Sequence, residues 1–370
     1  MNDSIKVLQI CSYYTGTKLY HKLFTSLSAL DVDENVYAFT SNSYKINESV
    51  NYDINVSNCY NRFDRMFFHL KHSKVFKDIE GKYEIEEFDI MHAHSLFSNG
   101  YIAYKLNQKY HIPYIVAVRN TDVNLFFKKM IHLRKTGLKI LKNANKIVFI
   151  SEPYKESTIQ SYIPKEYRED ILRKSVVIPN GIDEFWLNNK NDYRTNTVKN
   201  EIRLIYVGSI DKNKNIDTTI KACEILIKKG YKVCYTIVGD MVNKEYEKVI
   251  SRNYFINYIP FCEKEELINY YKKNDIFVMP SKHETFGLVY AEAMSQGLPV
   301  IYTKGQGFDN QFIDGEVGFS VSYDSAEEIV ESITKITDNY QKFSNNCLKK
   351  VNKFDWDKIA VQYLRIYNDK

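Results

Sequence analysis

The sequence predicts an α/β protein with two domains, each built on a doubly wound parallel sheet. Short β-branched runs alternate with helix-period stretches along the whole chain of 370 residues. Runs such as residues 115–118 are continuously apolar, which is typical of strands covered by helices on both faces. At roughly 150 residues per domain the length suits two domains. The hydrophobic share of 44% is enough for two packed cores.

Twelve strands are expected from these runs. In the first half they are residues 5–11, 35–39, 88–92, 113–118, 146–150 and 175–178. In the second half they are residues 203–207, 232–238, 255–259, 275–279, 299–302 and 317–321. Helix-period stretches such as residues 217–229 and 264–273 separate them. The turn signal Pro179-Asn180-Gly181 predicts the boundary between a first domain, 1–182, and a second domain that begins at residue 183.

The composition excludes several classes of protein. An aromatic content of 14% argues against disorder, and only 14 Gly and 7 Pro argue against collagen-like chains. No apolar run reaches the length of about 18 residues that a membrane span requires. The first ten residues lack the features of a signal peptide, so we expect a cytoplasmic protein. Six scattered cysteines without C-x-x-C spacing predict reduced, structural thiols.

The net charge of +5 is confined to the first half of the chain. Residues 1–183 contain 25 basic and 20 acidic residues, whereas residues 184–370 contain 26 of each. The segment Phe126–Lys146 has seven basic residues, no acid and interleaved apolar residues. We predict a basic amphipathic helix there, which is either a solvated face or a surface that rests on an anionic membrane. A nucleic-acid partner is not expected, because the second half is neutral.

The densest glycine cluster lies in residues 287–318, which hold six of the 14 glycines. Just before it, the strand at 275–279 ends in a Pro-Ser turn, and a helix is expected to start near Phe286 or Gly287. The free N–H groups at the start of such a helix can bind a phosphate. A glycine there lets the ligand come close to the backbone. Glu292 would then face a ribose, and Glu284 the other end of the ligand. Glutamates at this spacing also occur merely because an acid near a helix start favours the dipole.

A set of motifs in this order resembles family 4 of the retaining glycosyltransferases, which have the GT-B fold. The central motif is Pro280-Ser281-x-x-Glu284-x-Phe286-Gly287, followed by Glu292. Other matching segments are residues 176–183, 206–208 with Lys214, 237–240, 292–300 and 314–318. The resemblance covers nearly the whole chain. It implies two Rossmann-like domains facing a central cleft: an acceptor domain, 1–182, a donor domain, 183–352, and a C-terminal helix, 353–370, that crosses back to the first domain.

The resemblance also implies roles for single residues. Glu292 would bind the ribose, and the N–H groups of Gly287 and Leu288 the diphosphate. Glu284 would contact the donor sugar, while Lys214 would neutralise the leaving diphosphate in place of a metal ion. The expected donor-binding residues are Gly16, Gly208, Ser209, Lys214, Pro260, Phe261, Glu284, Phe286, Gly287, Leu288, Val289 and Glu292. No metal and no other cofactor are expected.

Three positions depart from the family's usual pattern. Ser209 stands where an arginine is usual, so one phosphate-neutralising charge is missing unless Lys212 or another residue supplies it. Arg119 stands where a histidine is common, and it is a candidate for cationic stabilisation in catalysis. The first loop has only Gly16 where two glycines are common.

Two shorter patterns carry weaker signals. His92 and His94 lie two positions apart on a predicted strand, as metal ligands can, but no carboxylate or cysteine at ligand spacing accompanies them. His94 is therefore predicted to be an acceptor-side or structural residue, with a general-base role as a further hypothesis. Residues 305–307, Gly-Gln-Gly, lack the third glycine of a dinucleotide fingerprint and are predicted to form a loop over the donor diphosphate.

The expected function is a cytoplasmic, metal-independent, retaining glycosyltransferase. It would transfer a sugar from a nucleoside diphosphate donor, with a UDP-sugar expected, to a saccharide or a lipid-linked saccharide. The Asn-, Lys-, Ile- and Tyr-rich composition suggests an AT-rich bacterial genome and hence surface-polysaccharide assembly. Two alternatives stay open: a catalytically degenerate nucleotide-sugar-binding or scaffold subunit, and a GT-B-fold enzyme with other chemistry such as epimerisation or phosphorolysis.

Overall fold

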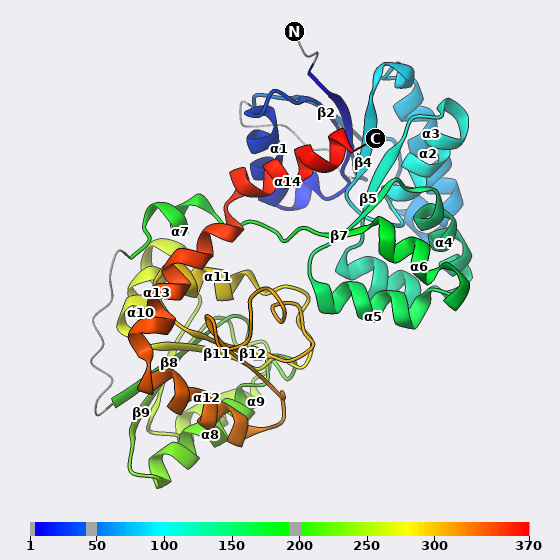
Figure 1. Cartoon of the computed structure of the whole chain (residues 1–370). Coiled ribbons are helices and arrows are strands. Elements are labelled where there is room, and N and C mark those ends of the chain that lie inside the picture. Colours follow the sequence, from blue (N-terminus) through cyan, green and yellow to red (C-terminus); the bar gives the residue numbers. More distant parts are fainter. Residues whose placement is uncertain (1–3, 42–49, 192–200, 370) are drawn as a thin grey trace. The chain divides into compact units, whose positions relative to one another are not determined.

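The computed structural model describes residues 4–41, 50–191 and 201–369. The described chain divides into two compact units (Figure 1). Unit 1 contains the residues up to Ile150, Tyr154–Gly181 and those from Trp356 onward, and unit 2 contains Ser151–Pro153 and the residues within Ile182–Asp355. The units change over at 181/182 and 355/356, beside the sequence-based boundaries at 182/183 and 352/353.

Unit 1 is built on a parallel sheet whose described strands pair in the order β3-β2-β1-β4-β5-β6-β7. The strands are β1 Lys6–Ile10, β2 Asp33–Phe39, β3 Asp53–Ser57, β4 Ile90–Ala93, β5 Tyr114–Ala117, β6 Lys146–Phe149 and β7 Ser175–Val177. The helices are α1 Leu19–Ser28, α2 Phe68–Glu80, α3 Gly100–Tyr110, α4 Arg134–Asn143, α5 Glu152–Tyr162, α6 Lys165–Lys174 and α14 Trp356–Asn368. The strand order reverses between β1 and β4, as in a doubly wound Rossmann-type sheet.

Unit 2 repeats this topology in a sheet whose described strands pair in the order β10-β9-β8-β11-β12-β13. The strands are β8 Glu201–Val207, β9 Lys232–Val238, β10 Ile256–Ile259, β11 Ile276–Met279, β12 Val300–Thr303 and β13 Gly318–Val321. The helices are α7 Glu184–Asn188, α8 Ile216–Lys228, α9 Glu245–Arg252, α10 Lys264–Lys273, α11 Leu288–Ser295, α12 Ala326–Asp338 and α13 Tyr340–Lys350. All described strand pairs in both sheets are parallel, which confirms the predicted α/β class with two doubly wound sheets.

Among the described strands, β3 was not predicted, whereas each of the twelve expected strands is present with ends shifted by at most two residues. β3 lies at the edge of its sheet and pairs only with β2. Its residues, Asp-Ile-Asn-Val-Ser, are mostly half-buried and mix polar with apolar side chains. Five residues with this composition carry too weak a signal to be separated from a loop.

The predicted basic helix over Phe126–Lys146 is wrong as a single element. The structure has a π-helix at Asp122–Phe127, a 3-10 turn at Ile131–Leu133 and then α4. Phe127 and Leu133 are both buried in the same core. In an unbroken α-helix, two side chains that are six residues apart point in directions about 120° apart. A continuous helix could therefore not bury both side chains on one side. The interruption of the helix therefore allows both Phe127 and Leu133 to pack in the core.

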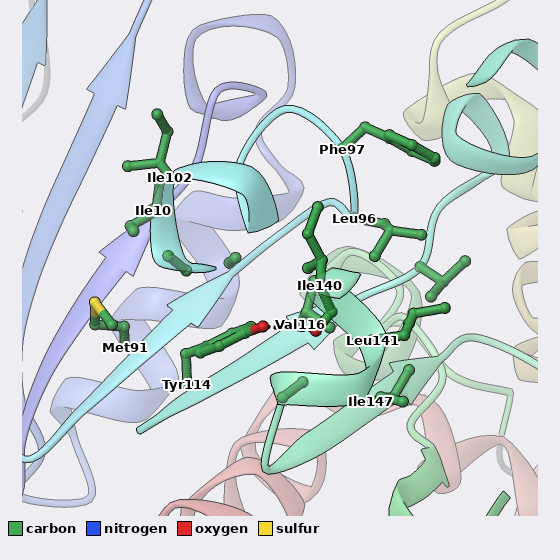
Figure 2. Packing of buried hydrophobic residues seen from close by; sticks show 14 of the residues in the cluster. Ile10, Met91, Leu96, Phe97, Ile102, Tyr114, Val116, Ile140, Leu141 and Ile147 are labelled. Atoms are coloured by element: carbon green, nitrogen blue, oxygen red, sulfur yellow. Dashed lines mark hydrogen bonds between the residues drawn. The ribbon is translucent and has the colours of Figure 1, made fainter. Parts of the chain in front are cut away.

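The two faces of the unit 1 sheet carry separate cores. On one face, α14 packs against α1 (Figure 1). The buried rings of Tyr363 and Tyr367 join that core. On the other, side chains from β4, β5 and α4 interlock, and Figure 2 shows the Tyr114 hydroxyl pointing to the backbone of Ile140, to which it donates a hydrogen bond. α4 is therefore fixed to the sheet by both packing and a buried hydrogen bond.

Candidate active site

The reversal of strand order in unit 2 lies between β8 and β11. At such a reversal the loops after the two strands diverge, and open α/β sheets bind ligands in the resulting crevice at the carboxyl ends. Here the loops are residues 208–215 after β8 and residues 280–287 after β11. They carry Lys214 and Glu284, the two residues predicted to act on the donor.

Lys214 and Glu284 form an ion pair in which Nζ lies 2.7 Å from Oε2. Their side chains are 22% and 13% exposed, so the pair is sheltered but still reachable from solvent. The turn that presents Lys214 is held by Asp211, whose Oδ1 accepts hydrogen bonds from the amides of Asn213 and Lys214 at 2.8 and 3.0 Å. The structure thus brings together the two predicted catalytic candidates of unit 2.

The loop of residues 305–307 supports Glu284 from its backbone. The amide of Glu284 donates to Oε1 of Gln306 at 2.9 Å, and its carbonyl accepts from the amide of Gly307 at 2.8 Å. Residue 307 must be glycine, because a Cβ there would come within 2.0 Å of the Thr285 carbonyl oxygen. The sequence predicted a loop over the diphosphate; the contact with Glu284 was missed.

Asn213 joins the two loops directly. Its side-chain amide donates to the His283 carbonyl at 2.9 Å and accepts from the His283 amide at 3.1 Å. Its carbonyl also accepts from the amide of Lys282 at 2.8 Å. Asp211, Asn213 and Gln306 are positioning residues that the sequence analysis did not identify. In the sequence they are marked only by the turn pattern Asp211-x-Asn213 and by the glycines on either side of Gln306.

The start of α11 has the form expected of an anion site. Gly287 is its N-cap with a φ of +78°, and no side chain caps the helix. A Cβ at Gly287 would lie 2.6 Å from the Tyr290 ring, so both space and conformation require glycine. Leu288 and Val289 supply the first amides of the helix. Phe286 is buried against Phe354, so its ring is a core residue rather than a ligand contact.

Glu292 lies further along α11 and is half-buried. Burial raises the pKa of its carboxyl to about 7, while a hydrogen bond with Tyr271 acts in the opposite direction. A helix carboxyl whose pKa is raised by burial is unusual, which marks Glu292 as a candidate for ligand binding.

Glycines line the neighbouring strand ends. Gly208, after β8, has a φ of +146°, and a Cβ at Gly239, after β9, would lie 2.1 Å from the Gly208 carbonyl oxygen. The Ser209 hydroxyl donates to Asp211 at 3.1 Å. Lys212 does not join Lys214, because its Nζ lies 3.2 Å from Glu245 on the exposed surface. The hypothesis that Lys212 replaces the missing charge at Ser209 has no support in this geometry.

Pro260 and Phe261 follow β10 at the same edge of the sheet. Both are exposed, and the Phe261 side chain is 61% exposed. A large apolar ring left open at a strand end is available for stacking, which is what the predicted contact with a base requires.

The candidates in unit 1 are mostly buried. Arg119 follows β5, is 9% exposed, and directs Nη1 toward the Asn180 side chain at 3.4 Å. Its amide donates to Asp122, which also accepts from the amides of Leu96 and Phe97 and so ties the loops after β4 and β5 together. Gly16 is exposed, and its backbone leaves room for a side chain.

His94 is fully buried, with Nε2 at 2.7 Å from Oε1 of Gln9 and the rings of Tyr20 and Phe24 packed edge-on against it. Burial holds the pKa of His94 well below its usual range. This geometry fits the structural alternative and gives a general base no path to solvent. Among the described residues, no group of three or more His, Cys, Asp or Glu is arranged to hold a metal ion.

Comparison with known proteins covers both units. A model of the glycosyl transferases group 1 matches residues 188–354, and a model of glycosyltransferase family 4 matches residues 21–184. An uncharacterized glycosyltransferase of Methanocaldococcus jannaschii is 25% identical over 343 residues, 91% of this chain and 90% of that one. The capsular polysaccharide biosynthesis glycosyltransferase CapM of Staphylococcus aureus is 30% identical over 238 residues, 60% of this chain and 61% of that one.

The fold has close matches among solved structures as well. Anabaena HepE in complex with UDP-glucose has a TM-score of 0.67 at 16% identity, over 99% of this chain and 100% of that one. Two consecutive family models, relatives over most of the length and a two-unit Rossmann-like fold agree with the motifs around Glu284. The chain belongs to family 4 of the GT-B glycosyltransferases and is a glycosyltransferase.

Proposed function

We propose that the chain is a retaining, metal-independent glycosyltransferase that acts in the cytoplasm. It moves a sugar from a UDP-sugar to a saccharide or lipid-linked saccharide in surface-polysaccharide assembly. The observation that carries this proposal is the Lys214–Glu284 pair in the loops at the strand reversal of unit 2, close in sequence to the uncapped start of α11.

A diphosphate fits this edge of unit 2 on electrostatic grounds. The free amides at the start of α11 and the ammonium group of Lys214 both attract anions. A diphosphate carries more negative charge than a carboxylate, so it competes with Glu284 for Lys214. Binding of the donor would then release the Glu284 carboxylate to accept hydrogen bonds from the sugar hydroxyls.

The nucleoside end of the donor is assigned to Glu292 and Phe261. The Glu292 carboxylate accepts hydrogen bonds from ribose hydroxyls, and the exposed Phe261 ring stacks on the base. HepE, which shares the fold, is described in complex with UDP-glucose, and this supports uridine as the nucleoside.

Transfer with retention requires attack from the face that the leaving group occupies. The bond from the acceptor oxygen to the anomeric carbon forms as the bond from that carbon to the phosphate oxygen breaks, and the acceptor proton passes to the leaving phosphate. Lys214 stabilises the charge that develops on the diphosphate, which is the task of a divalent cation elsewhere. Positioning and charge stabilisation then supply the rate acceleration without a protein base.

The acceptor is assigned to unit 1. Arg119 places a buried cation at the carboxyl end of β5, where an anionic acceptor group or the developing negative charge would be stabilised. CapM, the relative named for capsular polysaccharide biosynthesis, supports an acceptor that belongs to a surface polysaccharide.

The test is a donor screen with the purified protein and mass-resolved acceptor mixtures. We expect slow UDP release from one UDP-sugar, faster release with the correct acceptor, a retained anomeric configuration in the product, and unchanged rates in the presence of EDTA. Glu284→Ala should lower turnover strongly and leave UDP binding near normal, whereas Glu292→Ala should weaken UDP binding. Tight UDP binding without hydrolysis of any donor would instead indicate a nucleotide-sugar-binding subunit.

A further inference from the structure

Unit 1 exposes an unusual concentration of large apolar side chains. Six of the thirteen large hydrophobic residues that are exposed in the described chain come from two short segments. One segment, the 3-10 turn Phe63–Met66 with the start of α2, contributes Phe63, Met66, Phe67 and Leu70, which are 79%, 75%, 60% and 50% exposed. The other contributes Leu125 and Ile131, which are 41% and 64% exposed. Exposed apolar clusters of this kind mark interaction sites.

The two segments lie beside each other at one edge of unit 1. The ring of Phe68, in the first turn of α2, lies 6.1 Å from the ring of Phe126, which in turn stacks on Phe97 at 4.6 Å. The first segment follows β3 and the second follows β5, so both lie at the carboxyl edge of the parallel sheet. Together they form one surface, which we call the apolar face.

The apolar face is supported by fixed contacts underneath. Asp64 accepts from the amide of Asn61 at 2.8 Å and from Lys74 at 2.8 Å, which fixes the turn that carries Phe63 and Met66. Arg134 donates to the Phe127 carbonyl at 2.7 Å and lies over the Tyr162 ring, which fixes the break before α4. The exposed side chains are therefore held outward by the fold.

The charges on the two segments are all of one sign at the surface. Residues 61–71 and 123–146 contain one acid, Asp64, which is buried and paired with Lys74. The exposed basic residues near the carboxyl edge are Arg62, Arg65, Lys128, Lys129, Arg134 and Lys135, before α4 runs back toward the start of β6. This face therefore combines apolar side chains with basic ones and has no exposed acid. It complements a partner whose surface is negatively charged and whose interior is apolar.

We infer that the apolar face binds an anionic lipid bilayer, with its exposed aromatic and aliphatic side chains inserted among the headgroups and the lysines at the lipid phosphates. Long basic side chains can bury their stems and keep the charge at the phosphate level. A second copy of this chain is disfavoured as the occupant, because two such faces would bring like charges together. In the described residues no helix is both long and apolar enough to span the bilayer.

The location of the face has a consequence for the acceptor. Arg119 follows β5 at the same carboxyl edge of the unit 1 sheet, and the apolar face begins a few residues later. Attachment here would keep that edge close to the headgroups, where the sugar of a lipid-linked acceptor lies. This use of the face, though not the binding itself, depends on the proposed transferase activity.

Flotation with vesicles tests the inference. The full chain should float with vesicles that contain phosphatidylglycerol and remain unbound with vesicles of phosphatidylcholine alone. Raising the salt to about 1 M, where the Debye length is ~3 Å, should weaken binding. Phe63→Ser/Met66→Ser/Phe67→Ser should lower the partition coefficient by about tenfold or more. The matched control is Val242→Ser/Tyr254→Ser, two side chains of unit 2 that are 67% and 86% exposed, which should bind as the parent does.

A second variant tests the charges without disturbing the fold. Lys128→Gln/Lys129→Gln/Lys135→Gln should also lower the partition coefficient by about tenfold or more, since each base near an anionic surface contributes about fivefold. Arg134 is left in place because it holds the Phe127 carbonyl. UDP binding and the thermal midpoint should stay unchanged in both variants, which shows that they fold.

Three results would overturn the inference: flotation unaffected by the serine variant, equal flotation with neutral vesicles, or a dimer in solution that the serine variant dissociates while no vesicle binds. Failure of the donor screen with intact vesicle binding would instead remove the proposed transfer reaction and leave the bilayer surface in place.

Discussion

The two sheets have the same strand order around the reversal point, yet the two reversal points differ in what they hold. In unit 1, the strand end at β4 leads into His94, which is buried between Tyr20 and Phe24 and bonded to Gln9. In unit 2, the loops hold the Lys214–Glu284 pair, which remains open to solvent. The same topology thus supports a packed polar core in one unit and a charged pair within reach of solvent in the other.

The difference shows that the reversal of strand order provides a position where a ligand can bind. The residue types around it determine whether side chains fill that position or leave it accessible. Around β8, β9 and β11 the chain uses glycines whose backbone cannot carry a side chain, such as Gly239 and Gly287. Around β1 and β4 it uses aromatic rings and histidines, and the hydroxyl of Tyr367 from α14 closes the interior with hydrogen bonds to Gln9 and His92. Substitutions around the Lys214–Glu284 pair should therefore affect turnover, and substitutions around His94 should affect stability.

The largest effect is expected for Lys214→Met. Loss of the cation removes charge stabilisation at the leaving group, which typically lowers kcat by about 10²–10³. Lys212→Met is the matched control, because Lys212 is two residues away and pairs with Glu245 at the surface. Steady-state kinetics of UDP release would measure both. Equal losses in the two variants would mean that general positive charge, rather than the Lys214–Glu284 geometry, matters.

The second largest effect is expected for Gly307→Ala. A Cβ at this position meets the Thr285 carbonyl oxygen, so the loop must move away and Glu284 loses the support of both Gln306 and Gly307. We expect kcat to fall by about 10- to 100-fold, as for misplacement of a catalytic group by about 1 Å. Gly81→Ala, where a new Cβ meets only ordinary contacts, should leave kcat unchanged. Normal turnover in Gly307→Ala would show that the loop is not a support for Glu284.

A third prediction concerns Glu292 and pH. Burial raises the pKa of its carboxyl from 4.5 to about 7, and ribose hydroxyls donate hydrogen bonds to the ionised form. UDP affinity should be constant above pH 7 and fall by up to about tenfold per pH unit below it. The sign for stability is opposite: the free energy of unfolding falls as the pH rises from about 4.5 to 7, because the fold favours the neutral acid.

Calorimetric titration of UDP across this range measures the first effect, and urea unfolding measures the second. Glu292→Gln is the control, because it keeps the shape and removes the titration. If UDP affinity shows the same pH dependence in this variant, the titrating group lies elsewhere.

The smallest effect on turnover is expected for His94→Ala. The change leaves Oε1 of Gln9 without its partner and opens a cavity between Tyr20 and Phe24. We expect a loss of about 3 kcal/mol in the free energy of unfolding and less than about twofold in kcat at temperatures well below the midpoint. His69→Ala, at an exposed position, should change neither quantity. A large loss of kcat with an unchanged midpoint would restore the general-base hypothesis.

The sequence predicted the local elements well where the signal was strong and short-range. Buried strands of four residues, such as β5 and β11, are continuously apolar and were located with small errors at their ends. β3 was missed because an edge strand is half-exposed and its polar residues hide the pattern. The basic segment was misjudged because the helix period between Phe126 and Lys146 is broken by a demand of the core, the joint burial of Phe127 and Leu133.

For the candidate site, the sequence identified the residues with distinctive chemistry and missed those that position them. Glu284, Lys214 and Gly287 stand in recognisable motifs. Asp211, Asn213 and Gln306 act through hydrogen bonds to backbone groups, and Gln306 lies 22 residues from its partner. A polar residue whose partner is this far along the chain has no recognisable sequence pattern, because only the folded loops determine which group it contacts.

By itself, the sequence determined the two parallel sheets, the glycine-rich stretch and the excess of positive charge in the first half. Each of these depends on residue type and on neighbours along the chain, which a sequence states directly. The tertiary structure alone decided that Lys214 and Glu284, 70 residues apart, form one ion pair. It also decided that the His94 side chain is buried while those of Phe63 and Ile131 are exposed to solvent. Pairing and exposure depend on which distant segments the fold brings together, and parallel sheets join segments that are far apart in the chain.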